Sequence, residues 1–143
     1  MPLAVVDTNL LLRMAASQRH LPLYVAWRER RFDLIVSDVL LDEFEGVANR
    51  PSIRRFLSPL RAQEFAALLR AAAIPVFPAV QFPRCRDPKD DIVVATAVAA
   101  SPCYLVTADR DLYDDASLVN ALRELGVTVV QAADFLAALE GAD

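Results

Sequence analysis

A short apolar run, Leu3-Ala4-Val5-Val6, stands near the start of the chain and is followed directly by the acidic Asp7. Four apolar residues are too few for a helix but enough for a buried strand, so we expect a strand over residues 3–6. The same pattern recurs over residues 33–36, 104–107 and 127–130. Residues 74–77 form a weaker fifth candidate, because Pro75 restricts this segment to a strand end or a sheet edge.

Helical patterns fill the segments between these strands. Apolar residues recur at helical spacing over residues 21–30, 39–48, 60–73, 92–100, 117–125 and 132–139. Gly126 follows the fifth of these segments, at the position where glycine commonly ends a helix. Since short apolar strands alternate with helices, we expect an α/β fold. Its architecture would be a three-layer α/β/α sandwich around a central, mainly parallel sheet of about five strands.

Composition narrows the class of protein. The 143 residues fit one domain, and a hydrophobic content of 55% is enough for a sizeable core. Three glycines are too few for a Gly-rich dinucleotide fingerprint or a phosphate-binding P-loop. One histidine and two cysteines are too few for a structural zinc site. The net charge of −4 argues against binding nucleic acid through bulk positive charge, although all but one of the 15 basic residues are arginine.

The sequence predicts a protein without membrane association. Residues 92–108 form the longest uncharged run, but Pro102 divides it into a helix and a strand that are each too short to cross a bilayer. We find no signal peptide and therefore expect a cytoplasmic protein in which Cys85 and Cys103 are reduced.

Four acidic residues stand where the carboxyl ends of the strands are expected to meet. They are Asp7 after the first strand, Glu43 one turn into the helix after the second, Asp91 at the start of the helix over 92–100, and Asp109 after the strand over 104–107. Functional groups gather at this edge of open parallel sheets, so all four side chains could reach one rim.

Asp7, and two acids that precede Asp91, also have a purely structural explanation. Asp7 could be a helix N-cap, because aspartate accepts hydrogen bonds from the free amides of a first turn. Asp87 fits an N-cap with Pro88 at the first helical position, and Asp90 could be a first-turn charge. Periodicity favours Asp91 over Asp90 only weakly.

The helical pattern does not decide between two glutamates of the helix over 39–48. Leu40, Leu41, Phe44, Val47 and Ala48 share its apolar face, and Ser37 is a candidate cap. Glu43 and Glu45 flank that face at about equal distances, so either carboxylate could turn toward the rim.

Four segments in this order resemble the PIN domain family. They are Asp7-Thr8-Asn9 after a short strand, the stretch 36–51 that contains Glu43, the run Arg86-Asp87-Pro88-Lys89-Asp90-Asp91, and Leu105-Val106-Thr107-Ala108-Asp109-Arg110-Asp111-Leu112. More narrowly, the chain resembles the toxin components of bacterial toxin–antitoxin pairs. Ala108 stands where many relatives have glycine, a departure that removes no ligand.

The resemblance implies a single PIN-like nuclease domain over residues 1–143, acting as an endoribonuclease that needs one or two Mg²⁺ or Mn²⁺ ions. It assigns Glu43 over Glu45, and Asp91 over Asp90, as metal-site and catalytic acids beside Asp7 and Asp109. Supporting roles through hydrogen bonds or water fall to Asn9, Thr107 and Asp111. Arg84, Arg86 and Arg110 are neighbours of the acidic motifs, and we expect them to contact the RNA backbone. The implied protein partners are a cognate antitoxin and a second copy of the chain.

These residue types suit metal-assisted hydrolysis. Crowded carboxylates repel, and a hard divalent cation with oxygen ligands relieves that repulsion. His20 is far in sequence from the acidic motifs and offers no general base, so we expect the metal to activate the attacking water, with Asp7 as the central ligand. Two alternatives remain: an inactive PIN-like module that only binds a protein, and an aspartyl phosphatase or phosphotransferase with Asp7 as nucleophile. The second lacks an aspartate where Asn9 stands.

Overall fold

The computed structural model of the protein describes residues 1–78 and 91–141. In this part of the chain, five strands form one sheet in the order β3-β2-β1-β4-β5. The strands are β1 (Leu3–Val6), β2 (Asp33–Val36), β3 (Ile74–Pro75), β4 (Cys103–Val106) and β5 (Val127–Val130). Every pairing within the sheet is parallel. The parallel sheet predicted from the apolar runs is confirmed.

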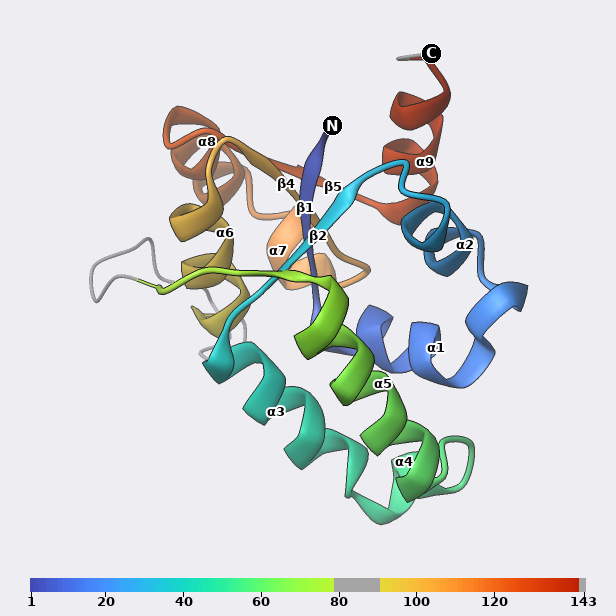
Figure 1. The fold of residues 1–143 in the computed structure, drawn as a ribbon. Helices are drawn as coiled ribbons and strands as arrows, with labels where there is room; N and C mark the ends of the chain where they lie inside the picture. The colour runs from blue at the N-terminus through green and yellow to red at the C-terminus, as the bar shows by residue number, and fades with distance from the viewer. Residues whose placement is uncertain (79–90, 142–143) are drawn as a thin grey trace.

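Helices lie on both faces of this sheet (Figure 1). They are α1 (Thr8–Ser17), α2 (Pro22–Arg28), α3 (Asp38–Ala48), α4 (Pro51–Arg54), α5 (Pro59–Ala72), α6 (Asp91–Ala100), α7 (Arg110–Tyr113), α8 (Ala116–Glu124) and α9 (Ala132–Gly141), with a 3-10 turn η1 (Gln18–His20). On one face α6 contacts β1, β2 and β4, and α8 contacts β5. On the other face α9 contacts β4 and packs against α2. The architecture is the predicted three-layer α/β/α sandwich.

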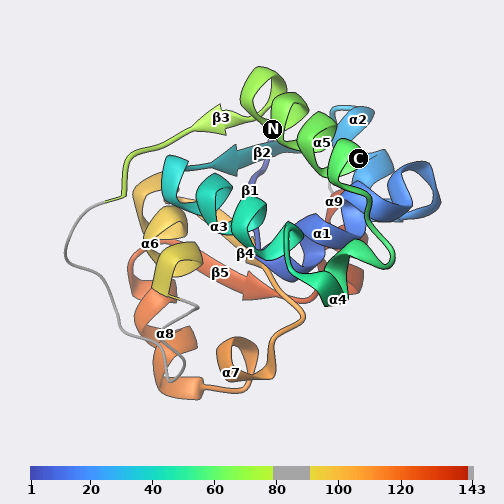
Figure 2. The same cartoon turned by 90° about the horizontal axis from the view of Figure 1, so that it is seen from below.

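Helices α1, α3 and α5 pack together beyond the edge of the sheet at which β1 ends (Figure 2). Phe44 of α3 and Phe65 of α5 are both buried, and their ring centroids are 5.7 Å apart. This aromatic contact ties α3 to α5, and both of these helices pack against α1. The first turns of α1 and α3 therefore adjoin the carboxyl ends of the strands.

Helix α1 was missing from the sequence prediction, which recognised only its possible cap. Its apolar side chains are buried at helical spacing: Leu10, Leu11, Met14 and Ala15. The short helices α4 and α7 were also not predicted, because four residues are too few to show a period. Helix 21–30 proves to be Pro22–Arg28. The strand expected over 74–77 keeps only Ile74–Pro75, at the sheet edge where proline is tolerated.

Gly126 and Pro102 lie between secondary-structure elements, as the sequence predicts. Gly126 follows α8 with a φ of 87°, and its backbone N–H donates to the Arg123 carbonyl at 3.0 Å. Pro102 separates α6 from β4, so the long uncharged run is divided. Among the residues that the structure describes, no helix has the length and apolar character needed to span a membrane.

Candidate active site

Asp7 and Thr107 lie side by side because of the register between β1 and β4. Val6 pairs with Val106, and the Asp7 backbone N–H donates to the Val106 carbonyl at 3.1 Å. Asp7 directly follows Val6, and Thr107 directly follows Val106. Both residues therefore lie at the carboxyl edge of the sheet. Only 6% of Asp7 and 0% of Thr107 is exposed.

Both oxygens of the Asp7 carboxylate accept hydrogen bonds. Oδ1 accepts from the Leu10 N–H at 2.9 Å, which makes Asp7 the N-cap of α1. Oδ2 accepts from the Thr107 hydroxyl and from the Ala108 N–H, the latter at 3.2 Å. The structural explanation of Asp7 as a cap is therefore correct. It leaves room for a second role, because Oδ1 carries two lone pairs and accepts one hydrogen bond, from Leu10, within the described residues.

Thr107 connects Asp7 to a second acid. Its hydroxyl oxygen accepts a hydrogen bond from the Asp109 N–H at 2.9 Å. The Asp109 side chain in turn accepts from the Asp111 N–H at 2.9 Å and caps α7. One buried hydroxyl thus contacts the Asp7 carboxylate and the Asp109 backbone, and so links two acidic residues that follow different strands.

The pKa of Asp7 is raised above its ordinary value of 3.8. Burial is the largest cause, because it disfavours the charged form, and the nearby charge of Asp109 acts in the same direction. Hydrogen bonds from Thr107, Leu10 and Ala108 oppose the rise. A cation beside these two carboxylates would favour the ionised form of Asp7.

The structure distinguishes between the two glutamates of α3. The Thr8 hydroxyl, in the first turn of α1, donates to Glu43 Oε2 at 2.5 Å. Glu45 turns away and forms an ion pair with Arg70 of α5 at 2.5 Å. Helix α3 therefore directs Glu43 toward the residue next to Asp7.

Asp91 opens α6 and is half-buried. Helix α6 leads into β4, which is parallel to the other strands, so it runs back from their carboxyl ends to their amino ends. Its first turn consequently lies toward the same edge as Asp7. Thr96, further along α6, joins its hydroxyl to that of Ser37 at 2.7 Å and ties the helix to the end of β2.

The four acids thus share one edge, but they do not form a compact cluster. Within residues 1–78 and 91–141, no three acidic, histidine or cysteine side chains lie close enough together to hold a metal ion. The geometry joins Asp7 and Asp109 through Thr107, and Glu43 to Thr8. The oxygen donors of these side chains fit Mg²⁺ or Mn²⁺, which prefer carboxylates and retain several waters.

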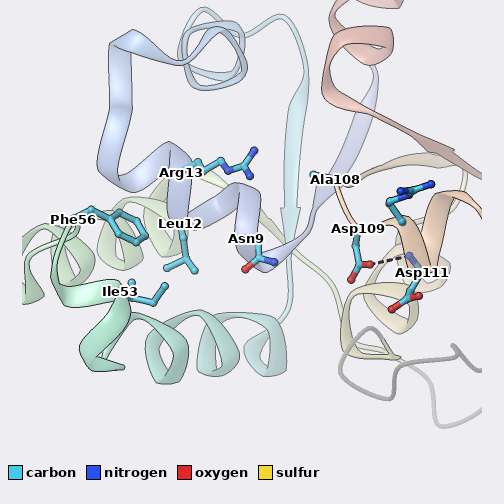
Figure 3. A pocket seen from close by; sticks show the side chains of 9 residues that line it. Asn9, Leu12, Arg13, Ile53, Phe56, Ala108, Asp109 and Asp111 are labelled. Atoms are coloured by element: carbon cyan, nitrogen blue, oxygen red, sulfur yellow. Dashed lines mark hydrogen bonds between the residues drawn. The ribbon is translucent and has the colours of Figure 1, made fainter.

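A pocket of about 510 Å³ adjoins the acids (Figure 3). Its walls come from three parts of the chain: Asn9, Leu12 and Arg13 of α1, Ile53 and Phe56 in and after α4, and Ala108, Asp109, Arg110 and Asp111 at the start of α7. Figure 3 shows Asn9 and Asp109 on opposite sides of this space. Two of the expected supporting residues, Asn9 and Asp111, therefore line the pocket, and the third, Thr107, lies buried behind it.

The predicted substrate arginines are only partly visible. Arg110 lines the pocket and forms an ion pair with Asp114 at 3.2 Å. Arg84 and Arg86 lie outside the described residues, as do Cys85, Asp87 and Asp90.

Cys103 is buried, and its thiol donates a hydrogen bond to the Ala97 carbonyl. Burial raises the pKa of this thiol to about 11.

Arg13 and Phe56 are among the pocket residues that the sequence did not assign to the site. Arg13 was not considered, because α1 was not predicted; on a helix, Asn9, Leu12 and Arg13 fall on one face at i, i+3 and i+4. Phe56 was not assigned to the site either; 54% of it is exposed, whereas the neighbouring Leu57 is buried. The signal that could have found Arg13 is the N-cap at Asp7 followed by an apolar helical repeat.

Comparison with known proteins agrees with this geometry. The family model of the PIN domain matches residues 4–111, which include Asp7, Glu43, Asp91 and Asp109. No curated protein matches the chain. PIN domains are in general nucleases, and they typically use divalent metals. Because the match extends over most of the sequence and the sheet has the expected parallel topology, the chain belongs to the PIN domain family.

Proposed function

We propose that the protein is an endoribonuclease that hydrolyses RNA phosphodiester bonds with the help of Mg²⁺ or Mn²⁺. The observation that carries this proposal is the linkage of Asp7 and Asp109 through the Thr107 hydroxyl beside an open pocket. Family membership supports nuclease chemistry in general. The choice of RNA rests on the resemblance to toxin components of toxin–antitoxin pairs.

The acids at the strand ends would hold the metal. On this proposal Asp7 and Asp109 are its first ligands, and Glu43 and Asp91 complete one or two ion sites from α3 and α6. A divalent ion held by these carboxylates would supply positive charge to the phosphoryl oxygens and would favour ionisation of the attacking water. Burial and the charge of Asp109 both resist ionisation of Asp7, and a cation counteracts both effects.

Residues around the acids would hold them in place. Thr107 fixes the Asp7 carboxylate, and Thr8 fixes the Glu43 carboxylate. The first turn of α1 adds partial positive charge at the edge where a phosphate would lie. Asn9 and Asp111 line the pocket, where they can orient water or a substrate oxygen. Arg110 offers a cation on the same wall.

The narrower resemblance supports a toxin role. A cognate antitoxin would then block the acidic pocket, the chain would pair with a second copy, and the protein would act in the cytoplasm. Expression in a bacterial host tests this role. Wild type should arrest growth, Asp7→Asn should not, and growth arrest that persists with Asp7→Asn would argue against it.

The direct test of the proposed activity is RNA cleavage by the purified protein. Wild type should cleave a mixed RNA pool with Mn²⁺ and not with EDTA, and should leave a DNA pool of matched sequence intact. Asp7→Asn, Glu43→Gln, Asp91→Asn and Asp109→Asn should each lower the rate by about 100-fold or more. Circular dichroism would verify that each variant is folded.

Three results would contradict the proposal. Full activity in folded Asp7→Asn would show that Asp7 is not the central metal ligand. A folded wild type that cleaves no RNA, and whose melting temperature Mn²⁺ leaves unchanged, would favour the inactive protein-binding module. Hydrolysis of phosphomonoesters without RNA cleavage would favour the phosphatase alternative, with Asp7 as nucleophile.

A further inference from the structure

We propose that the pocket beside the acids is a nucleotide subsite, in which Arg13 binds a backbone phosphate and Phe56 stacks on a base of the RNA. This inference rests on the proposed function, because it names the residues that would hold the RNA beside the same acids. It concerns binding of the nucleotide next to the scissile bond and no chemical step.

Arg13 is a cation available to a ligand. It is exposed and lines the pocket. In the part of the chain that the structure describes, its guanidinium has neither an ion pair nor a hydrogen bond with another residue. Figure 3 shows its side chain extending from α1 toward the side of the pocket that holds Ala108. The planar guanidinium matches phosphate oxygens in geometry and charge, so a phosphate is the group it fits.

Phe56 is an aromatic side chain that the fold presents to the outside. The neighbouring Leu57 is completely buried and anchors the segment, whereas 54% of Phe56 is exposed. Its ring forms the pocket wall with Leu12 and Ile53 (Figure 3). A half-exposed phenylalanine in a pocket offers a face on which a nucleobase can stack, and such stacking is tolerant of base identity.

The order of these groups fits one nucleic-acid strand. Across Figure 3, Phe56 lies at one end of the pocket, Arg13 and Asn9 follow along α1, and Asp109 lies at the other end. A strand whose scissile phosphate meets the acids would place its adjacent nucleotide against Arg13 and Phe56. The volume of about 510 Å³ falls in the range of about 300–1,000 Å³ that ligand-sized groups occupy.

Binding can be measured separately from cleavage. Fluorescence anisotropy with a labelled single-stranded RNA decamer, in buffer without divalent metal, gives the affinity of the wild type and its variants. Arg13→Gln should weaken binding about tenfold and reduce the dependence of log K on log salt by about 0.7. Phe56→Ala should weaken binding by about five- to 100-fold, and Phe56→Leu should weaken binding to the same extent. Phe56→Trp should retain the affinity of the wild type, because it keeps an aromatic face.

Abasic oligonucleotides locate the stacked base. Removal of one particular base should weaken binding to wild type and cause no further loss with Phe56→Ala, since the two changes delete the same contact. A role of Phe56 in stability alone would not produce this coupling. Arg123→Gln in α8 and Phe77→Ala are matched controls, because both residues are exposed and outside the pocket. Both controls should bind RNA like wild type.

The outcomes separate the subsite from the nuclease. If wild type cleaves RNA but Arg13→Gln and Phe56→Ala bind it as the controls do, the subsite is wrong while the nuclease stands, and the pocket is left for a protein partner. If wild type binds RNA with the expected losses but never cleaves it, the subsite holds and the nuclease fails. No affinity of the wild type for RNA at all overturns both proposals.

Discussion

The Thr107 hydroxyl donates a hydrogen bond to Asp7 Oδ2, although 100 positions separate the two residues in the sequence. The same oxygen accepts from the Asp109 N–H at 2.9 Å. Since Thr107 is fully buried, water cannot replace either contact easily. The position of two proposed metal ligands thus depends on one threonine that would itself touch no substrate.

Replacing this threonine should damage both stability and activity. Thr107→Val keeps the shape but removes the hydroxyl, so Asp7 loses a donor and the Asp109 N–H loses its acceptor. We expect the free energy of unfolding in urea to fall by about 1–3 kcal/mol and RNA cleavage to slow. Thr107→Ser, which restores the hydroxyl, should recover most of the activity.

Thr128→Val is the matched control for this change, because Thr128 is an exposed strand residue of β5. It should unfold like wild type and cleave RNA at the same rate. Wild-type activity in Thr107→Val would show that the hydroxyl does not position the acids.

The stability of the metal-free protein should depend on the protonation of Asp7. In the unfolded chain this carboxyl loses its proton near pH 3.8. In the folded protein its pKa is raised, so the carboxyl keeps its proton to a higher pH. Between these two values the folded state binds more protons, so the Asp7 contribution to the free energy of unfolding falls as pH rises. Mn²⁺ should reverse this trend, because it binds the deprotonated carboxylate.

Asp109→Asn isolates the contribution of charge repulsion to this effect. It removes the negative charge beside Asp7, so the Asp7 pKa should fall toward its ordinary value. Carbon-13 NMR titration of the Asp7 carboxyl measures both proteins directly. An Asp7 pKa below 3.8 in the wild type would disagree with burial as the dominant effect.

The two glutamates of α3 should behave differently. Glu43→Gln removes the carboxylate that lies beside Thr8, and we expect RNA cleavage to fall by about 100-fold or more. Glu45→Gln breaks a half-exposed ion pair with Arg70. Such pairs contribute about 0–1 kcal/mol, so this variant should fold normally and cleave RNA like wild type. Equal losses in both variants would contradict the assignment of Glu43 to the site.

Two glycine substitutions should change stability in opposite directions. Gly126→Ala places a Cβ on a backbone with a φ of 87°, which residues with a side chain rarely adopt, so unfolding should become easier by about 1 kcal/mol or more. Gly46 lies within α3 with nothing within 4 Å of an added Cβ. Gly46→Ala should therefore stabilise the protein by about 0.5–1 kcal/mol. Urea denaturation of both variants measures the contrast.

The sheet could be predicted from sequence because its strands are short, continuous apolar runs. Leu3–Val6 and Val127–Val130 show this clearly, and Pro75 marks the edge strand. Helix α1 could not be recognised by the same means, since its apolar residues include the consecutive run Leu10, Leu11 and Leu12, which hides the helical period.

The arrangement of the site residues could be predicted only in part from the sequence. That the acids follow strand ends could be inferred, but the register that pairs Val6 with Val106 is a tertiary property, and it alone brings Thr107 to Asp7. Helical spacing left Glu43 and Glu45 equivalent, whereas packing of α3 between α1 and α5 makes them different. Arg13 and Phe56 meet in one pocket only after α1 and α4 have packed.

The central claim is that Asp7 and Asp109 form the core of a divalent cation site. Anomalous diffraction from crystals grown with Mn²⁺ tests it most directly, because the anomalous scattering of manganese gives a peak at the position of the ion. The account predicts an anomalous peak within bonding distance of the Asp7 and Asp109 carboxylates, with Glu43 or Asp91 nearby, and no peak there in Asp7→Asn. Manganese bound elsewhere, or absent from this edge of the sheet at saturating concentration, would contradict it.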